Sequence, residues 1–115
     1  MNSQDYFHAK PDNLNCAQAI LKSFQKELDI PNSRIADFKA WGGGRAPEGI
    51  CGALFAADIL LAELGQPSIK EAFKERIGNI NCLAIKRENK IPCHDCVRIA
   101  DELLEKNKKI SVTIS

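Results

Sequence analysis

Residues 50–64, ICGALFAADILLAEL, form a segment that is apolar on nearly every side. A helix with so little polar surface has to be surrounded by other helices, so this segment predicts the central helix of a bundle. Gly65 and Pro67 follow the segment and are expected to end the helix. The segment is too short to cross a bilayer and carries Asp58 and Glu63, so we expect no membrane insertion.

Four other segments are predicted to be helical, at residues 14–28, 34–40, 68–77 and from residue 92 onwards. Pro31 closes the first of them, and Pro92 opens the last. Ser68 and Glu71 have the spacing of a capping box at the start of the third. Residues 86–91 are polar and predict a loop. Together these patterns predict an all-α, irregular bundle of about five helices.

A chain of 115 residues fits one domain, 1–115, with an N-terminal arm at residues 1–12 and a short tail at residues 110–115. The tail alternates apolar and polar residues, which is compatible with a strand that pairs with its copy in a homodimer and equally with a frayed terminus. The formal net charge is +1, so bulk charge gives no reason to expect nucleic acid as a partner. The N-terminus has no apolar run, which favours a cytoplasmic protein over a secreted one.

The chain has five cysteines, which is an odd number and too few for a disulfide scaffold. A domain of this length buries enough surface to fold without disulfides, so the cysteines need another explanation. Metal or cluster binding, dithiol–disulfide chemistry and simple burial in the core all stay open on this evidence. The five are Cys16, Cys51, Cys82, Cys93 and Cys96.

The cysteines gather at predicted helix starts, with Cys82 expected in a turn between helices. The first turn of a helix carries partial positive charge and unpaired amides, which lower a thiol pKa and stabilise thiolates. Several such ends that converge would form an electropositive pocket without any lysine. Cys93 and Cys96 form the chain's C-x-x-C unit, whereas structural zinc sites usually draw their ligands from two compact pairs. Ligands of iron–sulfur clusters are scattered more widely, so the spacing permits a cluster.

The glycine-rich segment at residues 41–49 predicts a tight loop that delivers the chain to Cys51. It has no G-K-[ST] ending and no preceding strand, so it is neither a P-loop nor a dinucleotide fingerprint. Glycine backbone can approach a cofactor closely, and a sharp turn is the simpler alternative. The candidate cofactor-binding glycines here are Gly42, Gly43, Gly44, Gly49 and Gly52.

Four stretches carry a family resemblance: NCAQAIL at residues 15–21, GGGRAPEGICGAL at 42–54, NCLAI at 81–85 and CHDCVRIA at 93–100. In this order, with the glycine loop before C-G-A, they resemble the C_GCAxxG_C_C family of redox-active proteins. A related region is similar to part of the split-Soret cytochromes, which carry non-haem iron besides haem. The resemblance therefore implies a redox function.

The four characteristic cysteines of that family correspond here to Cys16, Cys51, Cys82 and Cys93. The last is assigned because it precedes Val97 by four residues, as the family's last cysteine precedes a V-x-x-A helix. Cys96 is an addition and a candidate further ligand, and Ala56 stands where the family pattern has glycine. No histidine follows the C-x-x-C unit, so covalent haem is not expected.

The resemblance implies that these thiolates hold an iron–sulfur cluster, enclosed by the glycine loop, for electron transfer or redox sensing. Such a protein needs a redox partner protein and is an electron carrier or metal-binding protein more than an enzyme. One alternative is a thiol–disulfide oxidoreductase that uses Cys93 and Cys96. Another is an interaction module stabilised by zinc, and a protein with no cofactor also stays open.

Overall fold

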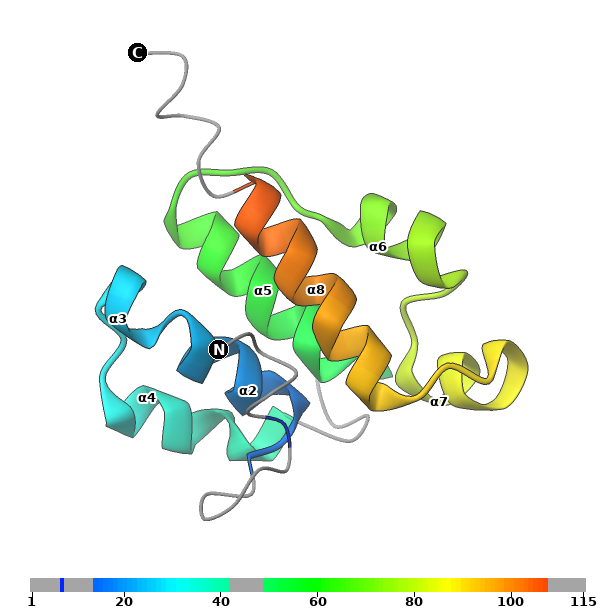
Figure 1. Cartoon of the computed structure of the whole chain (residues 1–115), viewed down its shortest axis with the longest axis horizontal. Helices are drawn as coiled ribbons and strands as arrows, with labels where there is room; N and C mark the ends of the chain where they lie inside the picture. The colour runs from blue at the N-terminus through cyan, green and yellow to red at the C-terminus, as the bar shows by residue number, and fades with distance from the viewer. Residues whose placement is uncertain (1–6, 8–13, 42–48, 108–115) are drawn as a thin grey trace.

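The computed structural model describes residue 7 and residues 14–41 and 49–107 (Figure 1). The predicted tail and all of the predicted arm except Phe7 lie outside this part of the chain. The described residues confirm the all-α prediction, since their only β-type pairings are two isolated bridges. The elements are α2 (Cys16–Ser23), α3 (Gln25–Leu28), α4 (Asn32–Asp37), the 3-10 helix η1 (Phe38–Trp41), α5 (Gly52–Glu63), α6 (Lys70–Ile77), α7 (Cys82–Ala84), the π-helix η3 (Ile85–Asn89) and α8 (Cys93–Asn107).

The core of the molecule is formed by α2, α5 and α8, which pack against one another. Figure 1 shows α5 and α8 side by side and running in the same direction, so their first turns lie at the same end. The prediction that residues 50–64 form the central helix is confirmed, because α5 buries Ala53, Leu54, Ala57 and Leu61 completely. No helix in the described part of the chain is long and apolar enough to cross a membrane.

The predicted helix at residues 14–28 is broken in two at Phe24. The break leaves the Phe24 side chain in the core, 3% exposed, while α3 continues along the surface to Asp29, which has a left-handed backbone (φ 54°). A short α4 and then η1 follow, where the pattern predicted one helical piece at residues 34–40. The described residues therefore form seven α-helices, more than the predicted number.

The start of α6 differs from the prediction at Ser68. Instead of forming a capping box with Glu71, the Ser68 hydroxyl donates to Asp58 of α5 over 2.7 Å. The amide of Ile69 also donates to Asp58, over 2.8 Å. Asp58 therefore caps the amide of Ile69, while the Ser68 hydroxyl accepts from the Lys70 amide over 3.1 Å. Gly78, with φ 103°, caps α6 after Ile77, the residue at which the helix was predicted to end.

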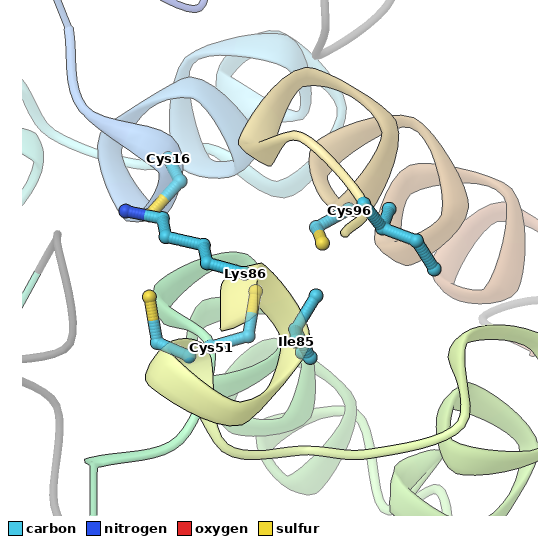
Figure 2. Close-up of a pocket in the computed structure, with 7 residues that line it drawn as sticks. Cys16, Cys51, Ile85, Lys86 and Cys96 are labelled. Atoms are coloured by element: carbon cyan, nitrogen blue, oxygen red, sulfur yellow. The ribbon is translucent and has the colours of Figure 1, made fainter. Parts of the chain in front are cut away.

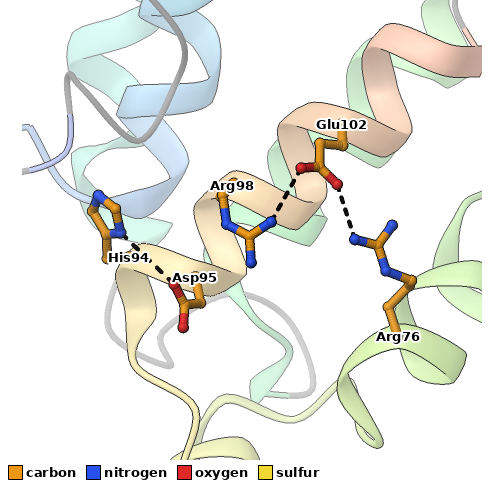
Figure 3. Close-up of polar contacts among 5 residues, drawn as sticks. All are labelled: Arg76, His94, Asp95, Arg98 and Glu102. Carbon is orange, nitrogen blue, oxygen red and sulfur yellow. Dashed lines mark hydrogen bonds and ion pairs between the residues drawn. The ribbon is translucent and has the colours of Figure 1, made fainter.

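An ionic contact joins α6 to α8 on the surface (Figure 3). Glu102 accepts from Arg76 of α6 over 2.9 Å and from Arg98, one turn earlier on α8, over 3.1 Å. These side chains are about half exposed, so the contact orients α6 more than it stabilises the protein.

The region after α6 is more helical than its sequence predicts. Cys82, expected in a turn, begins α7, and much of the polar stretch expected as a loop forms η3. The side chain of Ile85 explains the difference, because it is 1% exposed and its burial holds this segment against the core. Lys90, with φ 55°, ends η3.

Candidate functional site

Four cysteines from four different helix starts line one pocket, together with Ile85, Lys86 and Ile91. Figure 2 shows the labelled thiols directed toward a shared space. Their exposed fractions are 5% for Cys16, 4% for Cys51, 6% for Cys82 and 3% for Cys96. None of these four is in a disulfide. The fold therefore gathers into one buried site thiols that are far apart in the sequence.

Two of the cysteines occupy the same local structure. Cys16 is the first residue of α2 and Cys82 the first residue of α7, and each follows an asparagine that caps its helix. The Asn15 side chain accepts from the Gln18 amide over 2.8 Å, and that of Asn81 accepts from the Ala84 amide over 3.0 Å. Each cap fixes the helix start and so the direction of the following thiol.

Cys51 is the N-cap residue of α5 and lies beside the segment that precedes Cys82. Ile50 and Asn81 form an antiparallel bridge, and the Cys51 amide donates to the Ile80 carbonyl over 2.8 Å. The residues immediately before two of the pocket cysteines are thus bound to each other. This pairing depends on tertiary structure and had no signal in the sequence.

The glycines predicted to contact a cofactor are placed only in part. Gly42, Gly43 and Gly44 lie outside the described residues. Gly49 has φ 70°, a left-handed turn that favours glycine, and it leads the chain into Cys51. Gly52 is buried as the first residue of α5. The two described glycines therefore lie within two residues of Cys51, which lines the pocket.

The C-x-x-C unit opens α8. The amides of Asp95 and Cys96 donate to the carbonyl of Pro92, which confirms the predicted start. Cys93 is the first residue of the helix, but its side chain lies outside the described part, so its assignment as a ligand stays a prediction. Cys96, one turn later, lines the pocket. The added cysteine therefore belongs to the same site as the family's cysteines.

The pKa of the Cys51 thiol is raised well above its usual value near 9.0. The main cause is a hydrogen bond between the thiols of Cys51 and Cys96, and burial acts in the same direction. The amides of Ala53 and Leu54 lower the pKa, although neither makes a capping hydrogen bond of ordinary geometry. At Cys51 the helix start therefore lowers the pKa as expected, but the neighbouring thiol and burial outweigh this effect. Metal binding here would have to release a proton.

A lysine at the edge of the pocket was not predicted. Figure 2 shows the Lys86 side chain extending across the pocket toward Cys16. Lys86 follows Cys82 by four residues, which is the spacing of side chains on one helix face, but the expected loop hid this signal. A cation at this position favours thiolates and other anions in the pocket.

The pocket is nearly closed. The room left for the centre of a water molecule is about 10 Å³, which is about what one water needs. Among the described residues, no three cysteine, histidine or carboxylate side chains are arranged to hold a single metal ion. An iron–sulfur cluster differs from a single ion because its thiolates are divided among several iron atoms, one to each iron in a [4Fe–4S] cluster and two to each in a [2Fe–2S] cluster.

A small helical protein with buried, reduced thiols gathered in one pocket has the features of a cysteine-based redox protein. The family model described as "Putative redox-active protein (C_GCAxxG_C_C)" matches residues 14–110, and the chain belongs to this family. No curated protein and no solved structure matches the chain.

Proposed function

We propose that this protein binds an iron–sulfur cluster through cysteine thiolates and uses it to carry or sense electrons. The proposed ligands are Cys16, Cys51, Cys82 and Cys93. One observation carries the proposal: three of these side chains, which start three different helices, line a single buried pocket.

The donor chemistry of the pocket suits a cluster. Thiolates are the usual ligands of iron–sulfur clusters, and buried helix starts supply partial positive charge toward an anionic group. Lys86 adds a full positive charge at the edge. We propose that the glycine loop, including Gly42, Gly43 and Gly44, encloses the cluster.

The arrangement of the thiols favours a cluster over zinc. A structural zinc ion holds four ligands at about 2.3 Å from the metal, which brings its sulfur atoms to within about 4 Å of one another. The described residues offer no set of three ligands for a single ion. The zinc-stabilised module is therefore the weaker alternative.

Binding of a cluster requires the small pocket to widen. The segment that we propose to move is α7 with η3, because it contributes three of the side chains that line the pocket. Movement there would shift Cys82, Ile85 and Lys86 together, since all three lie on this segment. π-helical turns recur at functional sites, which agrees with such a role.

Anaerobic reconstitution with ferrous iron and sulfide tests the proposal. We expect iron and acid-labile sulfide to bind to the wild-type protein, together with visible absorption from thiolate-to-iron charge transfer. Cys16→Ser, Cys51→Ser, Cys82→Ser and Cys93→Ser should each lose most of the bound iron while their far-UV circular dichroism stays helical. Wild-type protein that takes up no iron would overturn the proposal.

Cys96→Ser is the matched control for Cys93→Ser, because each variant replaces one cysteine sulfur by oxygen on α8. We expect it to keep the bound iron. The opposite pattern, with iron retained by Cys93→Ser and lost by Cys96→Ser, would show that the fourth ligand lies one turn further along α8.

A further inference from the structure

The thiols of Cys51 and Cys96 form a pair that the proposed cluster does not explain. Both line the pocket, with exposed fractions of 4% and 3%, and Cys96 is the thiol whose interaction raises the pKa of Cys51. Cys51 caps the start of α5, and Cys96 lies in the first turns of α8, the helix packed beside it. Because both thiols face one pocket from two helices that pack against each other, a disulfide between them would join neighbouring elements.

We propose that in the metal-free protein Cys51 and Cys96 form a reversible disulfide when a small hydroperoxide enters the pocket, and that this disulfide closes the site to iron. Formation of the bond does not depend on the cluster, whereas closure of the site to iron rests on the proposed function.

The size of the pocket selects the oxidant. The space between the side chains is about 10 Å³ for the centre of a water molecule, so a reagent has to be close to water in size. Hydrogen peroxide meets this condition. A bulky disulfide such as oxidised glutathione does not, because a mixed disulfide with either buried sulfur would have to displace the surrounding helices.

The chemistry balances with one molecule of hydrogen peroxide. The first sulfur attacks the peroxide O–O bond, which gives a sulfenic acid and releases one water. The second thiol attacks the sulfenic sulfur, which forms the S–S bond and releases a second water. Two electrons pass from the two sulfurs to the peroxide. A dithiol reductant returns two electrons and two protons and restores both thiols.

The disulfide would remove one proposed ligand from the site. Cys51 donates to a cluster only as a thiolate, and a sulfur held in an S–S bond cannot do so. Cys96 would therefore act as a resolving thiol, which gives the added cysteine a role at the pocket without making it a ligand.

Peptide mapping of metal-free protein tests the bond. After treatment with hydrogen peroxide and alkylation, we expect a peptide cross-linked through Cys51 and Cys96, a loss of two alkylated thiols, and recovery of both with dithiothreitol. Cys96→Ser should lose the cross-link, and Cys93→Ser should keep it. Absence of the cross-link in wild-type protein, or a cross-link between Cys93 and Cys96 in its place, would overturn the proposal. So would oxidation by glutathione disulfide at a rate similar to that by peroxide.

A second measurement separates this inference from the proposed function. Peroxide-treated wild-type protein should take up iron and sulfide only at the low level of Cys51→Ser, and dithiothreitol should restore uptake. Peroxide-treated Cys96→Ser should keep its uptake. If the cross-link forms but untreated protein binds no iron, the disulfide stands and the cluster is wrong. If the cross-link forms and iron uptake is unchanged, closure of the site is wrong.

Discussion

At the scale of single residues, two asparagines decide where two of the pocket thiols lie. Asn15 forms a full capping box with Gln18, because each side chain bonds to the other's backbone amide. Its Nδ2 atom also donates to the carbonyls of Phe38 and Lys39. The residue before Cys16 therefore joins the start of α2 to η1, the element that leads into the glycine loop.

Replacement of this cap should destabilise the protein measurably. We expect Asn15→Ala to lower the free energy of unfolding of the metal-free protein by about 1–2 kcal/mol, as measured by urea denaturation. Asn15→Asp keeps the oxygen that accepts from the Gln18 amide but removes the donor to η1. Its free energy of unfolding should therefore fall by less than that of Asn15→Ala. Equal losses in the two variants would mean that the contact with η1, and not the cap, dominates.

The asparagine–cysteine pairs also show what could be predicted residue by residue. The placement of Cys16 at a helix start follows from local capping chemistry, and the sequence predicts it correctly. The same pair recurs before Cys82, but its helix is only three residues long, too short to leave a periodic pattern. The pKa of Cys51 was beyond prediction, because its main cause is a thiol on another helix.

At the scale of elements, the packing of α5 explains the departure from the family pattern at Ala56. This side chain is completely buried where the central helix meets its neighbours. The methyl group of Ala56 therefore packs in the core and should stabilise the folded protein. Its effect can be separated from helix propensity, because Ala62 of the same helix is exposed.

We expect Ala56→Gly to lower the free energy of unfolding by about 1–2 kcal/mol, the sum of helix propensity and one buried methyl group. Ala62→Gly should cost less than about 1 kcal/mol, because it loses propensity alone near the end of the helix. Denaturant titrations of both variants measure the difference. Equal costs would contradict a packing role for Ala56.

The contact between α6 and α8 should make stability depend on acid pH. Hydrogen bonds from Arg76 and then Arg98 lower the pKa of Glu102 below its usual value of 4.5. Around these two pKa values the unfolded chain therefore binds more protons than the folded one. The contact stabilises the folded protein at pH values above the usual pKa of 4.5, and this stabilisation is lost as the pH falls through the lower pKa of the folded state. Because the pair is exposed, the contribution should be under about 1 kcal/mol.

Glu102→Gln removes this titration. Its free energy of unfolding should fall less than that of the wild type between about pH 6 and pH 4, and added salt should reduce the difference. Parallel curves for the two proteins at low salt would contradict the role given to the carboxylate.

The helices predicted from sequence are those whose burial follows from local sequence, α5 from a continuous apolar run and α8 from apolar residues at helical spacing. The misplaced ones depend on contacts that are distant in the sequence. Ser68 is drawn away from its capping box by Asp58, and the stretch after Cys82 becomes η3 because Ile85 is buried in the core. A polar sequence such as KREN gives no local reason to expect a π-helix.

At the scale of the whole molecule, the packing of three helices that are distant in the sequence, α2, α5 and α8, creates the site. The first turns of α2 and α5 meet beside α8, and the bridge between Ile50 and Asn81 adds the start of α7. The sequence indicated which cysteines to gather but not how, because their order along the chain says nothing of the helix directions. Cys96, predicted only as a candidate further ligand, lines the same pocket.

The decisive measurement is the iron and acid-labile sulfide content of protein purified without exposure to oxygen. We expect both to be present and bound, and both to be lost in Cys16→Ser, whose thiol lies in the pocket. Wild-type protein that contains neither iron nor sulfide, and that takes up neither on reconstitution, would contradict it.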